Sequence, residues 1–329
     1  MPHVSVVIPA YNVEKTIAET IQSILDQSFS DFELIVINDG STDNTVEVVR
    51  QIPDPRIKIY SFENAGLPEA RNRGIRHATG KFVTFVDADD LWTPDKIEDQ
   101  LDALQAYPEA GVAYSWTAFI DENSQFLYAG EPFPHHGNVY PQLLVKNFIA
   151  SGSNIMIRRE VIDEIGEYDA TLKSAEDWEY NVRLAARYPF ARVPKYQVLY
   201  RKSSTSMTAK VDVMEHAILT VISRGFQTAP AELQFLKKQA LSNTYRFFTK
   251  LCLEHVSGNE GIKKARKNYF KSIRLHPKSV LKPETQRLGL KILINMVLPV
   301  QLSRQIVQFL GRSFPLVSKH KHAVKEEVR

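Results

Sequence analysis

Short apolar runs alternate with amphipathic helical patterns over the first 110 residues of the chain. Four of these runs are bounded by turn residues and have the length of strands, namely residues 4–8, 34–37, 56–60 and 81–86. Between the first two runs, Ile17, Ile21, Ile24 and Leu25 recur at helical spacing, and we expect Asn12 to cap this helix. Continuous apolar strands that alternate with helices predict a mainly parallel sheet covered on both faces.

Turn residues predict where further helices of this region begin. The polar run after residue 37 holds Ser41, Thr42 and Asp43, which are suited to cap a helix that carries Val46 and Val49. Another helix is expected to begin near Pro68, because proline suits a first helical position. The dipeptide Thr93-Pro94 then opens a helix with Ile97, Leu101 and Leu104 on one face.

The rest of the chain divides into an irregular middle and a helical end. In the middle, strands are expected over residues 112–119, 153–157 and 192–200, and a helix over residues 174–188. From about residue 211 the pattern is helical, with segments such as residues 263–275 and 288–310. We therefore expect an α/β domain over residues 1–208 and a helical C-terminal region over residues 209–329.

Composition places the chain among ordinary globular proteins. Of its 329 residues, 43% are hydrophobic and 24% are charged. The lone cysteine, Cys252, excludes an internal disulfide and a cysteine-based metal cage. The first residues lack the pattern of a signal peptide, and no apolar run approaches the length of a membrane span. These features predict a cytoplasmic protein.

Charge is distributed unevenly along the chain. From residue 231 onward there are 20 Lys and Arg against 6 Asp and Glu, whereas acidic residues outnumber basic ones before it. In one interpretation the basic helices pack on the α/β domain and expose a solvated face. In the other they are drawn to anionic lipid, with the protein held peripherally at the inner face of the membrane. No nucleic-acid-binding motif accompanies the charge, so nucleic acid is not an expected partner.

The acidic motif Asp87-Ala88-Asp89-Asp90 directly follows the fourth predicted strand. Its carboxylates repel one another unless a positive charge lies among them. Mg²⁺ and Mn²⁺ prefer oxygen ligands and commonly bind one or two carboxylates together with substrate phosphates. A turn before Thr93-Pro94 is the structural alternative. Because ligands bind beyond the carboxyl ends of parallel strands, the position of the motif favours the metal.

Two further polar positions are expected at the same edge of the sheet. Asp39 follows the second strand, where it can either accept a hydrogen bond from a nucleobase or cap the next helix. Tyr11 follows the first strand, so the geometry of a parallel sheet gathers it with Asp39 and Asp87. Arg71 lies in the first turns of a helix, where it can meet phosphate oxygens or remain a solvated surface residue.

A second acidic pair, Glu176-Asp177, opens the helix predicted from residue 174. The sequence Ser174-Ala175-Glu176-Asp177 resembles a capping box, and helix capping is therefore one role for these carboxylates. The other is that of a general base for an acceptor hydroxyl. Trp178 either belongs to the core or offers a flat face to a sugar ring. Glycine-rich dinucleotide and P-loop motifs and a nucleophile elbow are missing from the sequence.

Five short motifs, in family order, resemble those of the family 2 glycosyltransferases, which have the GT-A fold. The first two surround Pro9 and Asp39, and the third runs from Asn64-Ala65-Gly66 to Arg71-Asn72. The last two are Asp87-Ala88-Asp89-Asp90 and Glu176-Asp177-Trp178. The resemblance covers residues 4–178 and extends to about residue 208 if Tyr200-Arg201 opens the closing loop of the domain.

The resemblance implies an inverting transfer of a sugar from a nucleoside-diphosphate sugar to a hydroxyl of a glycan or a lipid-linked acceptor, in the synthesis of cell-surface polysaccharide or glycolipid. It implies that Asp177 is the catalytic base. It implies a donor site formed by Pro9, Tyr11, Asp39, Arg71, Asp87 and Ala88. Asp89 and Asp87 would hold a divalent cation, Mg²⁺ or Mn²⁺, and supporting roles fall to Asp90, Glu176, Trp178, Arg201 and Lys202.

The chain departs from the family pattern after Tyr200-Arg201. Many relatives place a histidine there that helps to bind metal or diphosphate, whereas this chain continues with Lys202-Ser203-Ser204. Arg201 or Lys202 is expected to neutralise phosphate instead. The alternative functions are a non-catalytic sugar-nucleotide-binding protein and a sugar nucleotidyltransferase, although the glycine-rich loop of the latter is missing.

Overall fold

The computed structural model describes residues 2–202, 211–256 and 258–297 of the chain. These residues form two compact units. The first contains residues 2–143 and 147–202, and the second contains residues 144–146, 211–256 and 258–297. The boundary expected between residues 208 and 209 lies outside the described residues, and the division into domains 1–208 and 209–329 stays a prediction.

The first unit is built on one mixed sheet, which has nine strands in the described part of the chain. The strands follow the order β3-β2-β1-β4-β8-β6-β9-β5, and β7 pairs with β6. Their bounds are β1 Val4–Ala10, β2 Phe32–Asn38, β3 Ile57–Ser61, β4 Phe82–Phe85, β5 Leu91–Trp92, β6 Val112–Ile120, β7 Phe126–Ala129, β8 Met156–Arg158 and β9 Phe190–Arg201. The first four strands are parallel, as the sequence pattern predicts.

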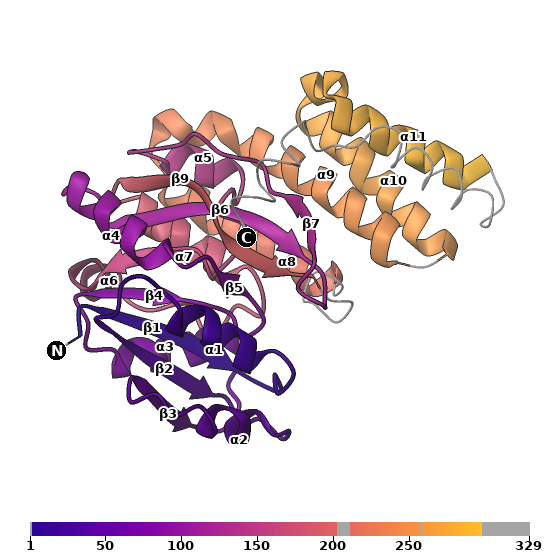
Figure 1. Ribbon diagram of the computed structural model, residues 1–329. Coiled ribbons are helices and arrows are strands. Elements are labelled where there is room, and N and C mark those ends of the chain that lie inside the picture. The colour runs from indigo at the N-terminus through magenta and orange to yellow at the C-terminus, as the bar shows by residue number, and fades with distance from the viewer. Residues whose placement is uncertain (1, 203–210, 257, 298–329) are drawn as a thin grey trace. The chain divides into compact units, whose positions relative to one another are not determined.

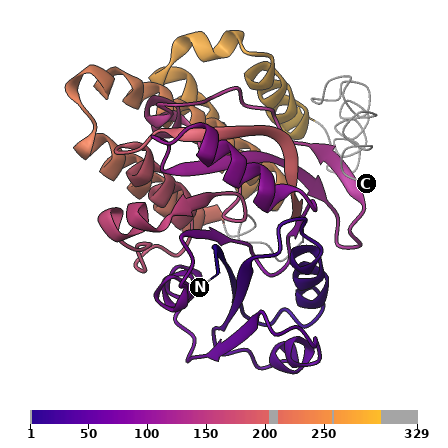
Figure 2. The same ribbon diagram turned by 60° about the vertical axis from the view of Figure 1, so that its left-hand side comes forward.

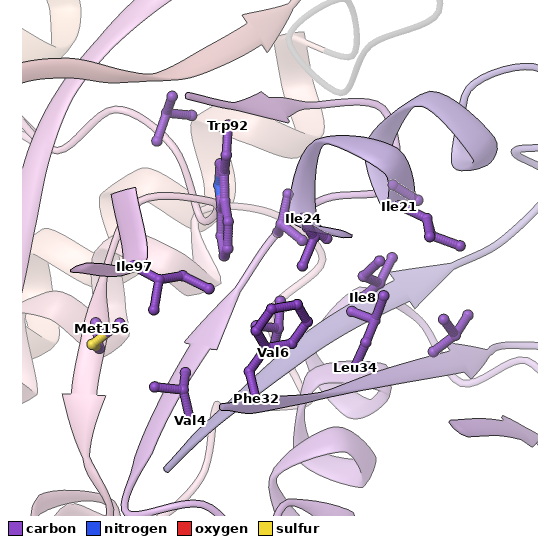
Figure 3. Packing of buried hydrophobic residues seen from close by; sticks show 14 of the residues in the cluster. Val4, Val6, Ile8, Ile21, Ile24, Phe32, Leu34, Trp92, Ile97 and Met156 are labelled. Carbon is purple, nitrogen blue, oxygen red and sulfur yellow. The ribbon is translucent and has the colours of Figure 1, made fainter. Parts of the chain in front are cut away.

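Helices cover both faces of the parallel part of the sheet (Figure 1). Along β1, Val4, Val6 and Ile8 point to a core shared with α1 and α4, as Figure 3 shows. Val7 points to the opposite face, where a Cβ atom on Gly74 of α3 would lie only 2.1 Å from its Cγ1 atom. Alternate side chains of one strand therefore fix one helix layer on each face.

Most helices of the first unit lie where the sequence pattern predicts them. Their bounds are α1 Ile17–Leu25, α2 Thr45–Arg50, α3 Leu67–His77, α4 Lys96–Ala106, α6 Arg159–Ile165 and α7 Glu176–Ala185, together with α5 Tyr140–Val145, whose last two residues belong to the second unit. Two expected caps are exceptions. The capping position of α1 is Thr16 rather than Asn12, and that of α2 is Asn44 rather than one of the three polar residues before it. The Asn12 side chain instead accepts a hydrogen bond from the backbone N–H of Thr42 at 2.8 Å. This side chain therefore links the loop after β1 to the loop after β2.

The second half of the sheet is mixed rather than parallel. β8 lies antiparallel to both β4 and β6, whereas β9 lies parallel to β6 and antiparallel to β5. The two-residue strand β5 and the short strand β7 carry no recognisable pattern in the sequence. They are strands only because long partners, β9 and β6, supply the hydrogen bonds.

The second unit is helical, as Figure 2 shows in orange and yellow. Its elements are α8 Val211–Thr228, the 3₁₀ helix η2 Ala231–Leu236, α9 Lys237–His255, α10 Gly258–Leu275, the 3₁₀ helix η3 Pro277–Leu281 and α11 Pro283–Val297. Small side chains let α9 and α10 pack closely, and the Ser272 hydroxyl donates to the backbone oxygen of Ser242 at 2.8 Å. The helix expected over residues 288–310 lies outside the described residues beyond Val297.

Candidate functional site

The carboxyl ends of β2, β1 and β4 lie side by side because β1 pairs with both of its neighbours. Pro9 is buried near the end of β1, and Tyr11, just beyond this strand, keeps 51% of its surface exposed. Asp39 follows β2, and Asp87 follows β4. This edge therefore combines an exposed aromatic ring with two carboxylates.

Asp39 joins its strand to the start of α3. Its Oδ2 atom accepts hydrogen bonds from the backbone N–H groups of Gly66 at 2.8 Å and Ala65 at 3.2 Å. Its Oδ1 atom accepts one from Arg73 Nη1 at 2.7 Å. Asp39 therefore does not cap the helix that follows it in sequence, and it orders the loop over residues 64–66.

Arg71 is a buried residue of α3, so it is not the solvated surface arginine of the alternative interpretation. Its Nη2 atom donates to Asp87 Oδ1 at 2.6 Å, and its Nη1 atom donates to Glu176 Oε1 at 2.6 Å. Burial by itself would lower the pKa of this guanidinium, but the two carboxylates outweigh burial and raise the pKa. The close approach requires Gly152, because a Cβ atom there would lie 2.3 Å from Arg71 Nη2.

The Asp89 side chain lies next to Asp87 and is only partly exposed. Burial, and then the negative charge of Asp87, raise the pKa of the Asp89 carboxyl to about 6. In the described residues no other side chain donates a hydrogen bond to this carboxylate. Ala88 between the two is buried, and its backbone oxygen accepts a hydrogen bond from Thr16 Oγ1 at 2.9 Å. The motif is thus held through its backbone while the Asp89 carboxylate retains acceptor capacity.

Asp90 points away from this carboxylate pair into the protein. Its Oδ2 atom accepts a hydrogen bond from Ser153 Oγ at 2.5 Å, and its Oδ1 atom accepts one from the backbone N–H of Arg201 at 3.0 Å. Burial raises the pKa of the Asp90 carboxyl well above its usual value. Asp90 therefore fixes the shape of the acidic loop. Ser153, which no sequence motif singled out, comes from an irregular segment and also accepts from the backbone N–H of Asp87 at 3.0 Å.

Arg201 holds the acidic loop from the other side. Its Nε atom donates to the backbone oxygen of Asp89 at 2.7 Å, and its Nη2 atom donates to Glu19 Oε2 at 2.7 Å. Its Nη1 atom donates to Ser124 Oγ at 2.8 Å. Every nitrogen of this buried guanidinium is thus engaged with protein oxygens. Lys202 donates to the Tyr128 hydroxyl at 3.1 Å, and the next residues of the loop, 203–210, lie outside the described residues.

The expected capping box at the start of α7 does not form. Ala175 occupies the capping position with a left-handed backbone, at φ 57°, and there is no side-chain cap. Glu176 instead pairs with Arg71. Left-handed alanine is strained, and such strain is often retained at functional sites. Trp178 is buried, and its indole N–H donates to the backbone oxygen of Leu143 at 2.7 Å, as expected of a core residue.

Asp177 is the partly exposed carboxylate of this helix start. Its Oδ1 atom accepts a hydrogen bond from the backbone N–H of Trp178 at 2.7 Å, and its Oδ2 atom accepts one from Asn147 Nδ2 at 3.3 Å. Desolvation raises the pKa of this carboxyl, whereas the nearby charge of Arg71 lowers it. Asn147, like Ser153, precedes β8 and was not predicted, because it becomes significant only through contacts distant in sequence.

The acidic loop suits a hard divalent cation whose coordination is completed by oxygen atoms of a substrate. Within the described ranges no group of three or more His, Cys, Asp and Glu side chains converges on one point. Asp89 and the second oxygen of Asp87 offer carboxylate donors, which suits Mg²⁺ or Mn²⁺ completed by phosphate oxygens and water. After burial, the negative charge of Asp87 is the next cause of the raised pKa of Asp89, and a bound cation would counter this repulsion.

Comparison with protein families decides the classification. The sequence profile of the family described as "Glycosyltransferase like family 2" matches residues 5–251. The chain belongs to glycosyltransferase family 2. This family 2 glycosyltransferase domain contains all the candidate residues described above.

Individual relatives agree with the family. The chain is 35% identical over 173 residues to the putative teichuronic acid biosynthesis glycosyltransferase TuaG of Bacillus subtilis, a match that covers 50% of the chain and 65% of the relative. Across four such curated relatives, the chain spans 20 to 65% of the length of the relative.

Solved structures show that the fold is of the GT-A type. TarS 1–349 of S. aureus superposes with a TM-score of 0.61 at 19% identity, covering 94% of this chain and 92% of that one. It has also been solved in complex with UDP-GlcNAc. The mannosyltransferase PcManGT of Pyrobaculum calidifontis, solved with GDP-Man and Mn²⁺, gives a TM-score of 0.58 at 19% identity and covers 94% of this chain and 84% of that one. The GT-A fold and the family predicted from the motifs are therefore confirmed.

Proposed function

We propose that the protein is a metal-dependent inverting glycosyltransferase that moves a sugar from a nucleoside-diphosphate sugar to an acceptor hydroxyl. The observation that carries the proposal is the double ion pair of Arg71, which links Asp87 of the acidic motif to Glu176, the neighbour of Asp177. One guanidinium thereby ties a candidate metal motif to a candidate base. Such a link suits a reaction in which the metal holds the donor while the base deprotonates the acceptor hydroxyl that attacks it.

The donor side of the site is assigned to the edge formed by Pro9, Tyr11, Asp39 and Ala88. The exposed ring of Tyr11 and the Asp39 carboxylate, which orders the loop over residues 64–66, offer a face and an acceptor for a nucleoside. Structural relatives of the fold are described with UDP-GlcNAc and with GDP-Man, which supports a nucleoside-diphosphate sugar as the donor class.

Asp89 and Asp87 would hold Mg²⁺ or Mn²⁺, and the bound cation would neutralise negative charge on the departing diphosphate. Arg71 restrains Asp87 through one oxygen, which leaves the second oxygen of this carboxylate for the cation. Asp90 and Arg201 keep the acidic loop in shape without using the Asp89 carboxylate. Asp90 accepts a hydrogen bond from the backbone N–H of Arg201, and Arg201 Nε donates to the backbone oxygen of Asp89.

Asp177 would accept the proton of the acceptor hydroxyl while that oxygen attacks the anomeric carbon opposite the leaving group. The C–O bond to the acceptor forms as the bond to the diphosphate breaks, so configuration inverts. The raised pKa of Asp177 makes it a stronger base than an ordinary aspartate, and the Asn147 amide orients one of its oxygens. The kinship with a putative teichuronic acid glycosyltransferase supports a role in cell-surface polysaccharide or glycolipid synthesis.

The test is a screen of nucleotide sugars for metal-dependent binding and slow hydrolysis, because hydrolysis requires no knowledge of the acceptor. Asp177→Asn should lower turnover by roughly 10²- to 10⁴-fold while metal-dependent nucleotide binding is retained. The matched control is Asp163→Asn, which alters an exposed aspartate of α6 and should leave turnover unchanged.

Three results would contradict the proposal. Normal turnover of Asp177→Asn would remove this residue as the base. Binding of sugar nucleotides without turnover of any of them would indicate a non-catalytic binding protein. Release of pyrophosphate from a nucleoside triphosphate and a sugar phosphate would identify a nucleotidyltransferase.

A further inference from the structure

The outward side of α10 presents a basic surface with an aromatic ring at its centre. We call Lys263, Arg266, Lys267, Phe270 and Arg274 the basic face. All five are exposed, and their spacing puts them on one side of the helix. The opposite side packs on α9 through small residues such as Ala265 and Ser272. The basic face is therefore not needed for the packing of α10 on α9.

The charges of this face lack acidic partners in the described parts of the chain. No Asp or Glu occurs between Lys263 and Arg274. Lys264 has a different position on the helix, and it pairs with Asp212 and Glu260. Over residues 211–297 the sequence has 15 Lys and Arg against 6 Asp and Glu. The surface thus carries a positive field that suits an anionic partner.

Exposed apolar side chains accompany the charge. Phe270 keeps 61% of its surface exposed in the middle of the basic face, and Leu281 of η3 keeps 73% exposed between Lys278 and Lys282. On the neighbouring helix α11, Leu290, Leu293, Met296 and Val297 are exposed as well. Apolar surface of this kind gains free energy when it leaves water.

This combination distinguishes a lipid surface from the other anionic or apolar partners. A nucleic acid or a phosphate polymer would complement the charge but would not need the aliphatic side chains. A second copy that pairs face to face would bring two basic faces together, which is repulsive. An anionic bilayer takes both kinds of group, because headgroups attract Lys and Arg while aromatic and aliphatic side chains enter the boundary below them.

We propose that the helical unit docks on an anionic membrane surface through the basic face, with Phe270 inserted among the lipids. No helix of the described residues combines the length and apolar character that a membrane span requires. The inference rests on the proposed function in one respect, since the membrane contact would hold a glycosyltransferase where lipid-linked acceptors lie. Its test uses lipid binding and does not depend on turnover.

The experiment is co-sedimentation of the full chain with vesicles of phosphatidylcholine alone or mixed with phosphatidylglycerol. The unaltered chain should bind the mixed vesicles and not the neutral ones. The triple variant Lys263→Gln, Arg266→Gln, Lys267→Gln should bind roughly a hundredfold more weakly, because each basic residue near the surface contributes about fivefold. Phe270→Ser should weaken binding by about tenfold without changing the charge.

The matched control removes three positive charges from exposed positions of the first unit, as Arg50→Gln, Lys81→Gln, Arg187→Gln. Its vesicle binding should remain close to that of the unaltered chain. Circular dichroism and donor hydrolysis in solution should be unchanged in all variants, which shows that they are folded. A chain that binds vesicles but turns over no donor contradicts the proposed function and leaves the membrane surface standing.

Four outcomes overturn the membrane surface. The first is equal binding to neutral and anionic vesicles, and the second is an equal loss of binding in the control variant. The third is a dimer that Phe270→Ser dissociates, which would make a second copy the partner. The fourth is vesicle binding that Phe270→Ser leaves intact together with tight binding to RNA or polyphosphate, which would indicate a general polyanion surface.

Discussion

Replacement of Arg71 by methionine tests the link between the acidic motif and the helix of Asp177. The guanidinium is buried and neutralises two carboxylates, of which Glu176 is 8% exposed and Asp87 is 24% exposed at the side chain. Removing one partner of a buried pair leaves an uncompensated charge and typically costs about 3–5 kcal/mol. Because Asp87 is partly solvated, the uncompensated charge of Glu176 dominates, and we expect a loss of unfolding free energy of about 3 kcal/mol.

The loss should depend on pH in a definite direction. Burial already raises the pKa of Glu176 above 4.5, and removal of Arg71 raises it further because the positive charge lowered it. A carboxyl with a raised folded pKa contributes stability at pH values below its unfolded pKa, and this contribution is lost as the pH rises through the folded value. Arg71→Met should therefore be destabilised less at about pH 5 than at about pH 8.

Urea unfolding at both pH values measures the effect. The double variant Arg71→Met, Glu176→Gln is the matched control, because it removes both charges and should regain part of the lost stability. In the donor assay, Arg71→Met should also shift the acidic limb of turnover to higher pH, since Arg71 lowers the pKa of Asp177. A loss below about 1 kcal/mol that is equal at both pH values, without recovery in the double variant, would refute the proposed link.

Three other variants and conditions test separate parts of the site and fold. In the unaltered enzyme, turnover should fall as the pH drops through the raised pKa of Asp177, because a base acts only when deprotonated; a flat acidic limb in a pH–rate profile would contradict this role. Asp89→Asn should weaken the Mn²⁺-dependent part of nucleotide binding by roughly 10- to 100-fold, measured by calorimetry with and without metal, and equal affinities in the two proteins would exclude Asp89 as a ligand. Gly74→Ala should cost about 1–3 kcal/mol in urea unfolding, because the added methyl group overlaps Val7 at 2.1 Å, and a variant as stable as the parent would mean that α3 shifts freely.

The alternation of strands and helices was predictable because it depends on local periodicity. Continuous apolar runs such as β1 and β2 are buried on both faces, and this leaves a pattern in the sequence itself. The short strands β5 and β7 were not predictable, because pairing with β9 and β6 rather than their own residues makes them strands. The cap predictions at Asn12 and at the start of α7 were wrong for a similar reason. Asn12 accepts a hydrogen bond from Thr42, and Glu176 accepts one from Arg71, and both partners are distant in sequence.

By itself, the sequence determined the family, the parallel half of the sheet and the acidic motif at its edge. It left open whether Arg71 is solvated or bound, because one arginine on a helix carries no signal for its partners. The tertiary structure decided this, by bringing Asp87 and Glu176 to the two ends of one guanidinium and by placing Gly152 where a side chain would block it. The physical reason is that two charges attract each other strongly only where water is excluded. Segments distant in sequence must come together to exclude it.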